Sequence, residues 1–239
     1  MAYDFLDLHV ADQISLSDDH VALKKAVRKF ATEVVRPAAI ELDKMSAEDV
    51  ARKDSPYWTV MRKVHELGYH TIFISEEYGG LGLDPLGIHI FFEEMAAASI
   101  GIAVACGVDV FPTFFANMIV SDYPQLEDIL LKPYVNDRDC SMLGCWAITE
   151  PEHGSDILTP YQPHFHNPKI SHQLVGKKDG DDWILNGQKA AWVSNGTTAS
   201  MALLFFGTDP SMGLAGGGIA IADLSDKGVS RGKTLEKIG

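Results

Sequence analysis

Apolar residues in the first half of the chain recur at intervals of three and four, the spacing of one face of an α-helix. The two clearest stripes consist of Val27, Phe30, Ala31 and Val34, and of Val60, Met61, Val64 and Leu67. Pro37 should end or bend the first helix, and Gly68 should cap the second. Further helical patterns cover residues 86–98 and 126–131. The first half is therefore predicted to be helical.

The longest apolar run, Ile100–Val120, is long enough to be considered as a membrane span. It contains Asp109, Pro112 and Asn117, and a charge inside a bilayer is costly. The run therefore favours a buried helix, broken near Pro112, over a transmembrane helix.

The second half of the chain changes to the short apolar runs of β-strands. Strands are predicted over residues 142–149, 183–185, 188–193, 200–207 and 217–224. Asn186-Gly187 lies between the second and third runs and predicts a tight hairpin there. The change of pattern at Asp137-Arg138-Asp139 divides the chain into a helical domain, residues 1–138, and a β domain, residues 139–239. The fold class is therefore predicted to be α+β.

The composition is that of a globular protein, with 46% hydrophobic and 22% charged residues. A net charge of −13 and the lack of a basic stripe argue against nucleic-acid binding. Cys106, Cys140 and Cys145 have no metal-ligand or CxxC spacing, and we expect buried thiols. The sequence at the N-terminus does not resemble a signal peptide, which favours a cytoplasmic location.

Several residues suggest catalytic or ligand-binding roles that their surroundings in the sequence support poorly. His164 and His166 have no carboxylate or thiolate at matching spacing, so we expect a solvated loop and no metal. His153 is interpreted as a solvent-facing turn residue, with a proton shuttle as the alternative. Ser155 lacks the G-x-S-x-G elbow of a hydrolase. The glycine-rich residues 78–83 lack the strand and helix that flank a phosphate-binding loop.

Two short stretches carry the most informative chemistry. Residues Cys145–Asp156 end an apolar run and turn through Pro151 and Gly154, presenting small polar groups and backbone N–H donors. Residues Ala191–Gly196 form a second marker, in which a tryptophan precedes small polar residues.

These stretches resemble the two flavin-contacting segments of the acyl-CoA dehydrogenase family. The matching residues are Ile148-Thr149-Glu150-Pro151 with Gly154-Ser155-Asp156, Leu185-Asn186-Gly187-Gln188-Lys189 with Trp192-Val193-Ser194-Asn195-Gly196, and the loop Glu76–Gly82 in the helical half. The resemblance implies an N-terminal all-α domain followed by an antiparallel β-barrel-like domain. It also implies an FAD that lies against the β domain and an acyl-CoA thioester that stacks on the flavin.

The resemblance assigns cofactor contacts to Trp146, Ile148, Thr149, Gly154, Ser155, Trp192, Val193 and Ser194. Ser155 would also meet the substrate. The residue types suit these roles, because a flat apolar ring needs aromatic and aliphatic walls and nearby hydroxyl donors tune a flavin. The resemblance identifies no catalytic residue in this chain, and no metal ligand is expected.

The sequence departs from the family pattern in four ways. The stretch Lys189–Trp192 is one residue longer than usual, residues 158–173 form an insertion, and Glu152-His153 replaces small residues. The chain also stops at Gly239, before the C-terminal helical bundle that carries the family's catalytic glutamate, much of its FAD site and its oligomer interface.

The resulting expectation is FAD-dependent α,β-desaturation of an acyl-CoA thioester, with electron-transferring flavoprotein as the acceptor. The resemblance gives neither Glu77 nor Glu150 the role of base, so a missing segment or a second subunit should supply it within a homo- or hetero-oligomer. Two alternatives are an enzyme like acyl-CoA oxidase and a non-catalytic subunit that binds a flavin or a partner. Neither nucleic acid nor a membrane is expected as a partner.

Overall fold

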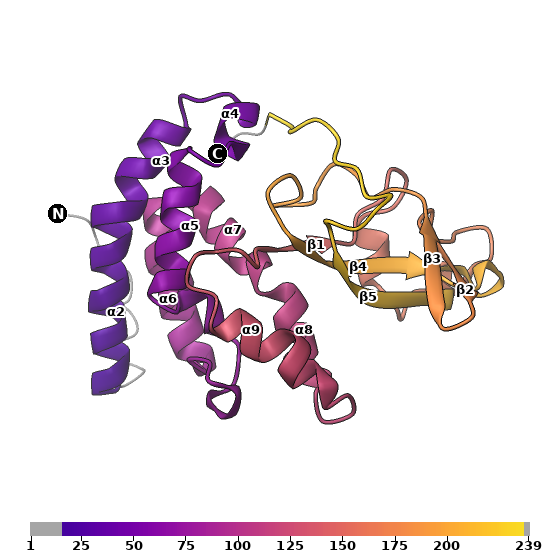
Figure 1. The fold of residues 1–239 in the computed structure, drawn as a ribbon, viewed down its shortest axis with the longest axis horizontal. Helices are drawn as coiled ribbons and strands as arrows, with labels where there is room; N and C mark the ends of the chain where they lie inside the picture. Colours follow the sequence, from indigo (N-terminus) through magenta and orange to yellow (C-terminus); the bar gives the residue numbers. More distant parts are fainter. Residues whose placement is uncertain (1–15, 237–239) are drawn as a thin grey trace.

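Helices and strands occupy separate parts of the protein in the computed structural model, which describes residues 16–236 (Figure 1). The α-helices are α2 (Asp18–Phe30), α3 (Arg36–Leu42), α4 (Ala47–Ala51), α5 (Pro56–Glu66), α6 (Pro85–Ala98), α7 (Ile100–Asp109), α8 (Phe111–Ile119) and α9 (Lys132–Val135). Side-chain caps fix several helix starts; in α2 the Ser17 hydroxyl accepts a hydrogen bond from the His20 N–H. The predicted helical first half is confirmed.

The strands form one mixed sheet centred on β4. The strands are β1 (Gly144–Ala147), β2 (Val175–Asp179), β3 (Asp182–Asn186), β4 (Met201–Gly207) and β5 (Gly217–Asp223). Strand β4 pairs in parallel with β1, antiparallel with β5, and in parallel with β2 at Gly207 only. The order of a helical domain followed by a β domain is as expected, but the sheet is neither purely antiparallel nor closed into a barrel.

The predicted hairpin at Asn186-Gly187 is wrong. The hairpin is formed by the antiparallel strands β2 and β3, and Gly180-Asp181 forms the two-residue turn between the paired residues Asp179 and Asp182. Gly180 has a φ of +63°, the left-handed conformation that such a turn requires. Strand β3 ends at Asn186, and residues 188–193 are not in a strand. The turn lies within the charged run KKDGDD, residues 177–182, which has no apolar pattern typical of strands. Asn186-Gly187 was the stronger hairpin signal in the sequence.

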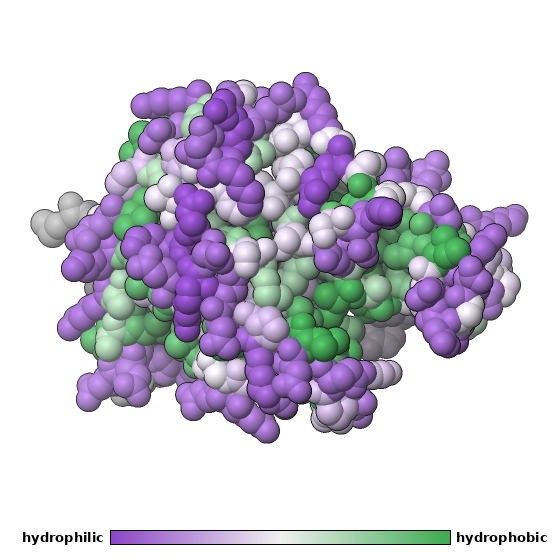
Figure 2. Space-filling view, in the orientation of Figure 1, coloured by the Kyte–Doolittle hydropathy of each residue, from purple (hydrophilic) through white to green (hydrophobic). Residues whose placement is uncertain are grey.

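The apolar run from residue 100 divides into α7 and α8 at Val110, beside Pro112 as predicted. In the described part of the chain, one helical stretch, Ile100–Ile119, is long and apolar enough to span a membrane, but half of it is buried inside the protein. Both helices pack against β1. Figure 2 shows apolar side chains gathered where α8 meets the sheet, and Met118 of α8 and Ile219 of β5 are exposed.

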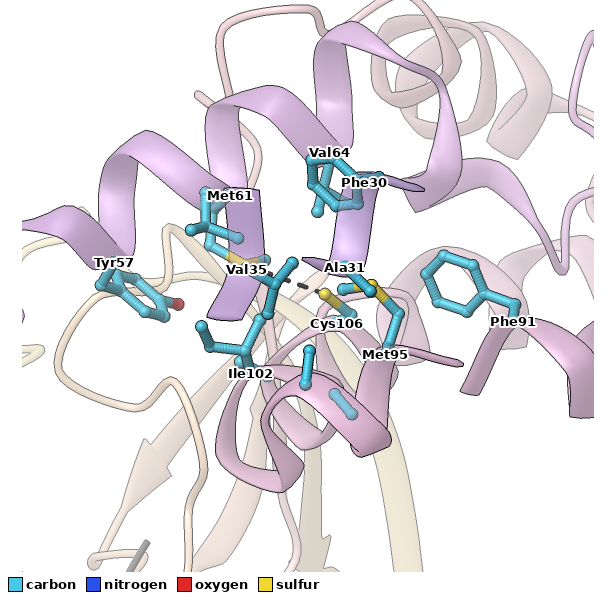
Figure 3. Packing of buried hydrophobic residues seen from close by; sticks show 14 of the residues in the cluster. Phe30, Ala31, Val35, Tyr57, Met61, Val64, Phe91, Met95, Ile102 and Cys106 are labelled. Atoms are coloured by element: carbon cyan, nitrogen blue, oxygen red, sulfur yellow. Dashed lines mark hydrogen bonds between the residues drawn. The ribbon is translucent and has the colours of Figure 1, made fainter. Parts of the chain in front are cut away.

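The main hydrophobic core lies among α2, α5, α6 and α7 (Figure 3). The predicted stripes supply much of it, since Val27, Phe30, Val60, Met61 and Val64 are buried. Leu67 departs from the prediction because it lies at the C-cap of α5, where it is 49% exposed. All three cysteines are free and buried, as expected.

Pro37 does not end its helix, which was one of its two predicted effects. The π-helical segment Ala31–Val35 precedes it, and the N–H of Arg36 bonds the carbonyl of Ala31, five residues back. The wider turn removes the need for a proline N–H at the usual position, so the helix continues through α3.

A buried histidine joins the helical domain to the start of β1. His65 Nε2 lies 2.9 Å from Asp109 Oδ2, and His65 Nδ1 lies 3.2 Å from Asp137 Oδ2. Asp109 accepts a hydrogen bond from Gly144 N, and Asp137 accepts one from Met142 N. Burial alone would lower the pKa of His65, but its two carboxylate partners outweigh burial and raise the pKa to about 12. The domain junction therefore contains an imidazolium ion between two carboxylates.

Candidate functional site

The two marker stretches of the sequence lie side by side in the structure. The N–H of Ala190 donates to the carbonyl of Thr149 at 3.1 Å. The ammonium group of Lys189 donates to the carbonyl of Ile148 at 3.0 Å and to Glu150 Oε1 at 2.8 Å. Residues 148–150 and 189–190 are thus joined by backbone and side-chain bonds.

Glu150 is the buried anchor of this junction. Its side chain receives hydrogen bonds from the N–H groups of Gln173 and Leu174 as well as from Lys189. Burial would raise the pKa of the carboxyl, but the nearby His172 ring and these donors lower the pKa to about 2. The carboxylate therefore stays ionised at neutral pH, and a pKa this low is poorly suited to a proton acceptor.

The turn at residues 150–156, the first turn, is held by hydrogen bonds among its own residues. The N–H of Glu150 donates to the carbonyl of His153 at 2.9 Å, and Asp156 Oδ1 accepts from the N–H of Gly154 at 2.7 Å. His153 does not face solvent as predicted; Nδ1 lies 2.8 Å from Asp156 Oδ2 and Nε2 lies 3.0 Å from the carbonyl of Ser171. Its ring is largely covered because the insertion folds back over it.

The turn at residues 190–196, the second turn, has two non-glycine residues in the left-handed region of backbone conformation. These are Ala191 at φ +58° and Asn195 at φ +61°. The N–H of Trp192 donates to the carbonyl of Ala190 at 2.8 Å, which makes Ala191 the centre of a three-residue turn. Trp192, Val193 and Ser194 lie between these two conformations.

Asn195 ties the second turn to the helical domain. Its side-chain amide donates to the carbonyls of Ala105 and Gly144, and its Oδ1 accepts from the Tyr57 hydroxyl at 3.0 Å. A pocket of about 130 Å³ lies at this contact. It is lined by Ala47, Val50, Ala51, Tyr57, Asn195, Thr197, Thr198 and Thr234.

The residues assigned to the cofactor differ in how much surface they offer. Trp146 stacks on Phe111 with ring centroids 4.8 Å apart, and Ile148 is buried beside Ile157 and Leu214. Val193 is half-buried in a separate apolar cluster. These side chains are packed against other side chains of the protein.

The remaining assigned residues are open to a ligand. Trp192 is 68% exposed, Ser155 and Ser194 are exposed, and Thr149 is half-buried. No atom lies within 4 Å of the position that a Cβ on Gly154 would take. An exposed indole, hydroxyl donors and an uncovered glycine backbone are chemically suited to a flat, partly polar ring such as a flavin.

Both ends of the insertion, residues 158–173, lie next to the first turn. The insertion starts at Leu158, the last residue of the 3₁₀ turn Ser155–Leu158, and ends at Gln173, whose Oε1 accepts a hydrogen bond from Glu152 N. Tyr161 at its far side is 97% exposed. His164 Nε2 lies 3.0 Å from the Thr159 hydroxyl. Across residues 16–236, no group of three or more His, Cys, Asp or Glu side chains is arranged to hold a metal ion.

Sequence reasoning missed the residues that join the two turns. Lys189 and Glu150 are separated by 39 residues, and Asn195 and Tyr57 by 138. No spacing rule connects residues so far apart, although Lys189 lies within one of the quoted motifs.

Comparisons with known proteins agree with the two-domain organisation. The family model for the acyl-CoA dehydrogenase N-terminal domain matches residues 17–121, and that for the middle domain matches residues 145–239. The mitochondrial short-chain specific acyl-CoA dehydrogenase of Mus musculus is 28% identical over 239 residues, which cover 99% of this chain and 52% of that protein. The chain thus spans about half the length of the curated relatives it matches.

Solved structures share the fold. A glutaryl-coenzyme A dehydrogenase in complex with glutaryl-CoA has a TM-score of 0.67 at 28% identity, covering 90% of this chain and 49% of that one. A chain in the structure of the electron transferring flavoprotein of Acidaminococcus fermentans has a TM-score of 0.68 at 25% identity, covering 88% and 49%.

Proposed function

The chain belongs to the acyl-CoA dehydrogenase family, and on that premise we propose that it supplies flavin- and substrate-contacting segments for the α,β-desaturation of an acyl-CoA thioester. FAD is the proposed cofactor, and an electron-transferring flavoprotein is the proposed acceptor. The catalytic base would come from a further segment or from another polypeptide.

One observation carries the proposal: the two marker turns meet through the N–H of Ala190 and the carbonyl of Thr149, which are 41 residues apart in the chain. Their exposed groups include Trp192, Ser194 and Ser155. Groups that converge on one surface from distant parts of a chain are typical of a binding site.

The residues of this chain would bind, orient and shield. Trp192 offers an aromatic wall that excludes water, and Thr149 and Ser194 offer hydroxyl donors. The open side of Gly154 lets a ligand approach the backbone closely, and Ser155 beside it would meet the thioester. When bound, FAD would supply the acceptor for the β-hydrogen, which leaves as a hydride, while the catalytic base would take the α-proton.

A covering element, either a further segment or a second polypeptide, is supported by the apolar surface where α8 meets the sheet (Figure 2). Exposed apolar patches of this kind favour protein contacts. Relatives about twice as long as this chain contain additional residues that could cover such a surface.

The proposal predicts that the assembled protein binds FAD and that an acyl-CoA bleaches the bound flavin under anaerobic conditions. The measurement is a visible absorption titration with saturated acyl-CoA thioesters of several chain lengths, after native mass spectrometry has identified the bound cofactor and any partner polypeptide. FAD binding without bleaching by any thioester would exclude the dehydrogenase and leave a non-catalytic flavin-binding subunit.

The same preparation separates a dehydrogenase from an oxidase. Under air, an oxidase would consume oxygen in proportion to the thioester, whereas a dehydrogenase would require an added electron-transferring flavoprotein for turnover. No binding of FAD at all would contradict the proposed function itself.

A further inference from the structure

Glu150 and Lys189 form a buried ion pair near the proposed site. The Glu150 residue is 2% exposed and the Lys189 side chain is 7% exposed. Neither side chain therefore presents appreciable surface to a cofactor or a substrate. Their effect on a ligand must be transmitted through the residues that they hold.

Lys189 holds the chain immediately before the exposed part of the second turn. Its ammonium group donates hydrogen bonds to the carbonyl of Ile148 and to Glu150 Oε1. The N–H of the next residue, Ala190, donates to the carbonyl of Thr149. Burial lowers the pKa of Lys189, while the Glu150 carboxylate opposes that shift. These contacts fix the segment before Ala191 against the first turn.

The segment between the two left-handed residues is held at both ends. On its N-terminal side, the segment is held by the contacts of Lys189. On its C-terminal side, it is held by the side chain of Asn195, which forms hydrogen bonds with Ala105 O, Gly144 O and the Tyr57 hydroxyl. A non-glycine residue at positive φ persists only where its surroundings hold it there. Ala191 has no side-chain hydrogen bond of its own to stabilise this conformation, so the contacts on either side must do so.

Stability alone does not require charges at this place. A buried ion pair is often replaceable by apolar side chains of similar volume at little cost in folding free energy, because desolvation offsets the attraction. What apolar side chains cannot reproduce is the direction of the Lys189 donors toward two specified oxygens. The geometry therefore favours a positioning role.

We propose that the Glu150–Lys189 ion pair positions the segment Trp192–Ser194 for FAD, and that both side chains act on cofactor binding without touching the cofactor. This inference rests on the proposed function, because it concerns the cofactor named there.

The test is a double-mutant cycle in the assembled protein. The variants are Lys189→Met, Glu150→Gln and the double variant, which removes both charges at similar volume. Each apoprotein is titrated with FAD by flavin fluorescence, the visible spectrum of the bound flavin is recorded, and the melting temperature without FAD is measured separately. Lys132→Met is the matched control, because Lys132 forms ion pairs with Glu127 and Asp128 at the surface, far in sequence from the turns.

We expect each single variant to weaken FAD binding roughly ten- to a hundredfold, the range found when groups that orient direct ligands are removed. The double variant should bind FAD about as weakly as the weaker single variant, because the two side chains act as one unit. The bound flavin spectrum should change with the affinity, and Lys132→Met should bind FAD as the wild type does.

Three results would overturn the inference. Wild-type affinity and spectrum in the double variant, with only a lower melting temperature, would mean that the pair is purely structural. Additive effects of the two substitutions would mean that the side chains act independently. Failure of the wild type to bind FAD would overturn the proposed function and this inference together. If a single variant fails to fold because one charge is left unpaired, the double variant still decides between the first result and the proposal.

Discussion

At the scale of the residue, backbone conformation distinguishes the second turn from an ordinary loop. Ala191 and Asn195 both have positive φ, which is uncommon outside glycine. Asparagine is enriched in this region, and Asn195 also satisfies three partners across the domain junction. Alanine has neither advantage, so Ala191 marks where the fold maintains a strained conformation beside an exposed tryptophan.

Replacing Ala191 with glycine should separate stability from binding. The substitution removes about 1–2 kcal/mol of left-handed strain and costs about 0.4–1 kcal/mol through the freer unfolded chain. We expect a free energy of unfolding equal to or slightly above that of the wild type, together with severalfold weaker FAD binding, because the turn loses its fixed pose. Thermal melts and FAD titrations of Ala191→Gly check both.

Ala190→Gly is the matched control for this prediction, because Ala190 keeps the N–H that bonds Thr149 but has no positive φ to relieve. It should lower the free energy of unfolding by about 0.5–1 kcal/mol. Tighter FAD binding by Ala191→Gly than by the wild type would contradict the account of the turn.

At the scale of the element, the helices accommodate two internal prolines by the same device. The π-helical segments Ala31–Val35 and Glu127–Leu131 each end two residues before a proline, Pro37 and Pro133. In each, an N–H bonds a carbonyl five residues back, which leaves room for a ring that lacks a donor. The usual rule that proline ends a helix fails here because the strain is absorbed upstream.

The location of the hairpin turn leads to an element-scale prediction. Gly180 has a φ of +63° with open space around it, so Gly180→Ala should cost about 1 kcal/mol from backbone strain alone. At Gly187, φ is +137° and an added Cβ would meet Gln173 O and Leu174 Cα, both at 2.6 Å. Gly187→Ala should therefore cost more than about 2 kcal/mol.

Denaturant unfolding of the two glycine variants measures this difference. Equal losses would indicate that Gly187 has the freedom of a turn residue and that the observed placement of the hairpin is wrong.

At the scale of the whole molecule, the His65 imidazolium links the helical domain to the sheet. Its two carboxylate partners also hold Gly144 and Met142, at the start of β1. His70 stacks on His65 at 4.1 Å, and burial together with the neighbouring charge lowers the pKa of His70 to about 3. One ring of the stacked pair is therefore charged and the other neutral.

The ion pairs of His65 with Asp109 and Asp137 make the free energy of unfolding depend on pH. The pKa of His65 is raised from 6.5 to about 12, so its contribution is complete below pH 6.5 and is lost as the pH rises toward 12. His65→Gln should cost about 3–5 kcal/mol at about pH 6, because it leaves two buried carboxylates without their cation. The difference from the wild type should narrow by about 1.4 kcal/mol per pH unit above 6.5.

Denaturant unfolding of the wild type and His65→Gln from about pH 6 to about pH 9 checks this dependence. His89→Gln, at an exposed histidine on α6, is the control and should have little effect at any pH. A pH-independent cost of His65→Gln would mean that the buried ring is neutral.

Much of the fold could be predicted from particular residues because the determining interactions are local. Helical spacing located α5 and α6 closely, and the apolar runs at 200–207 and 217–224 located β4 and β5. The two marker turns were likewise recognisable as short contiguous patterns. The hairpin was misplaced because Asn186-Gly187 has the local residue pattern of a tight turn, whereas the strand pairing places the turn at Gly180-Asp181.

The sequence by itself determined where the helical and β parts lie, that the cysteines are buried, and which stretches match the pattern of the acyl-CoA dehydrogenase family. It did so because helix and strand periodicities and turn chemistry depend on neighbours in the chain. Only the tertiary structure decided the mixed pairing around β4, the Glu150–Lys189 junction, and the burial of His153 and His65. Those features join groups from 3 to 72 residues apart, and their free energies depend on burial, which exists only once the chain has folded.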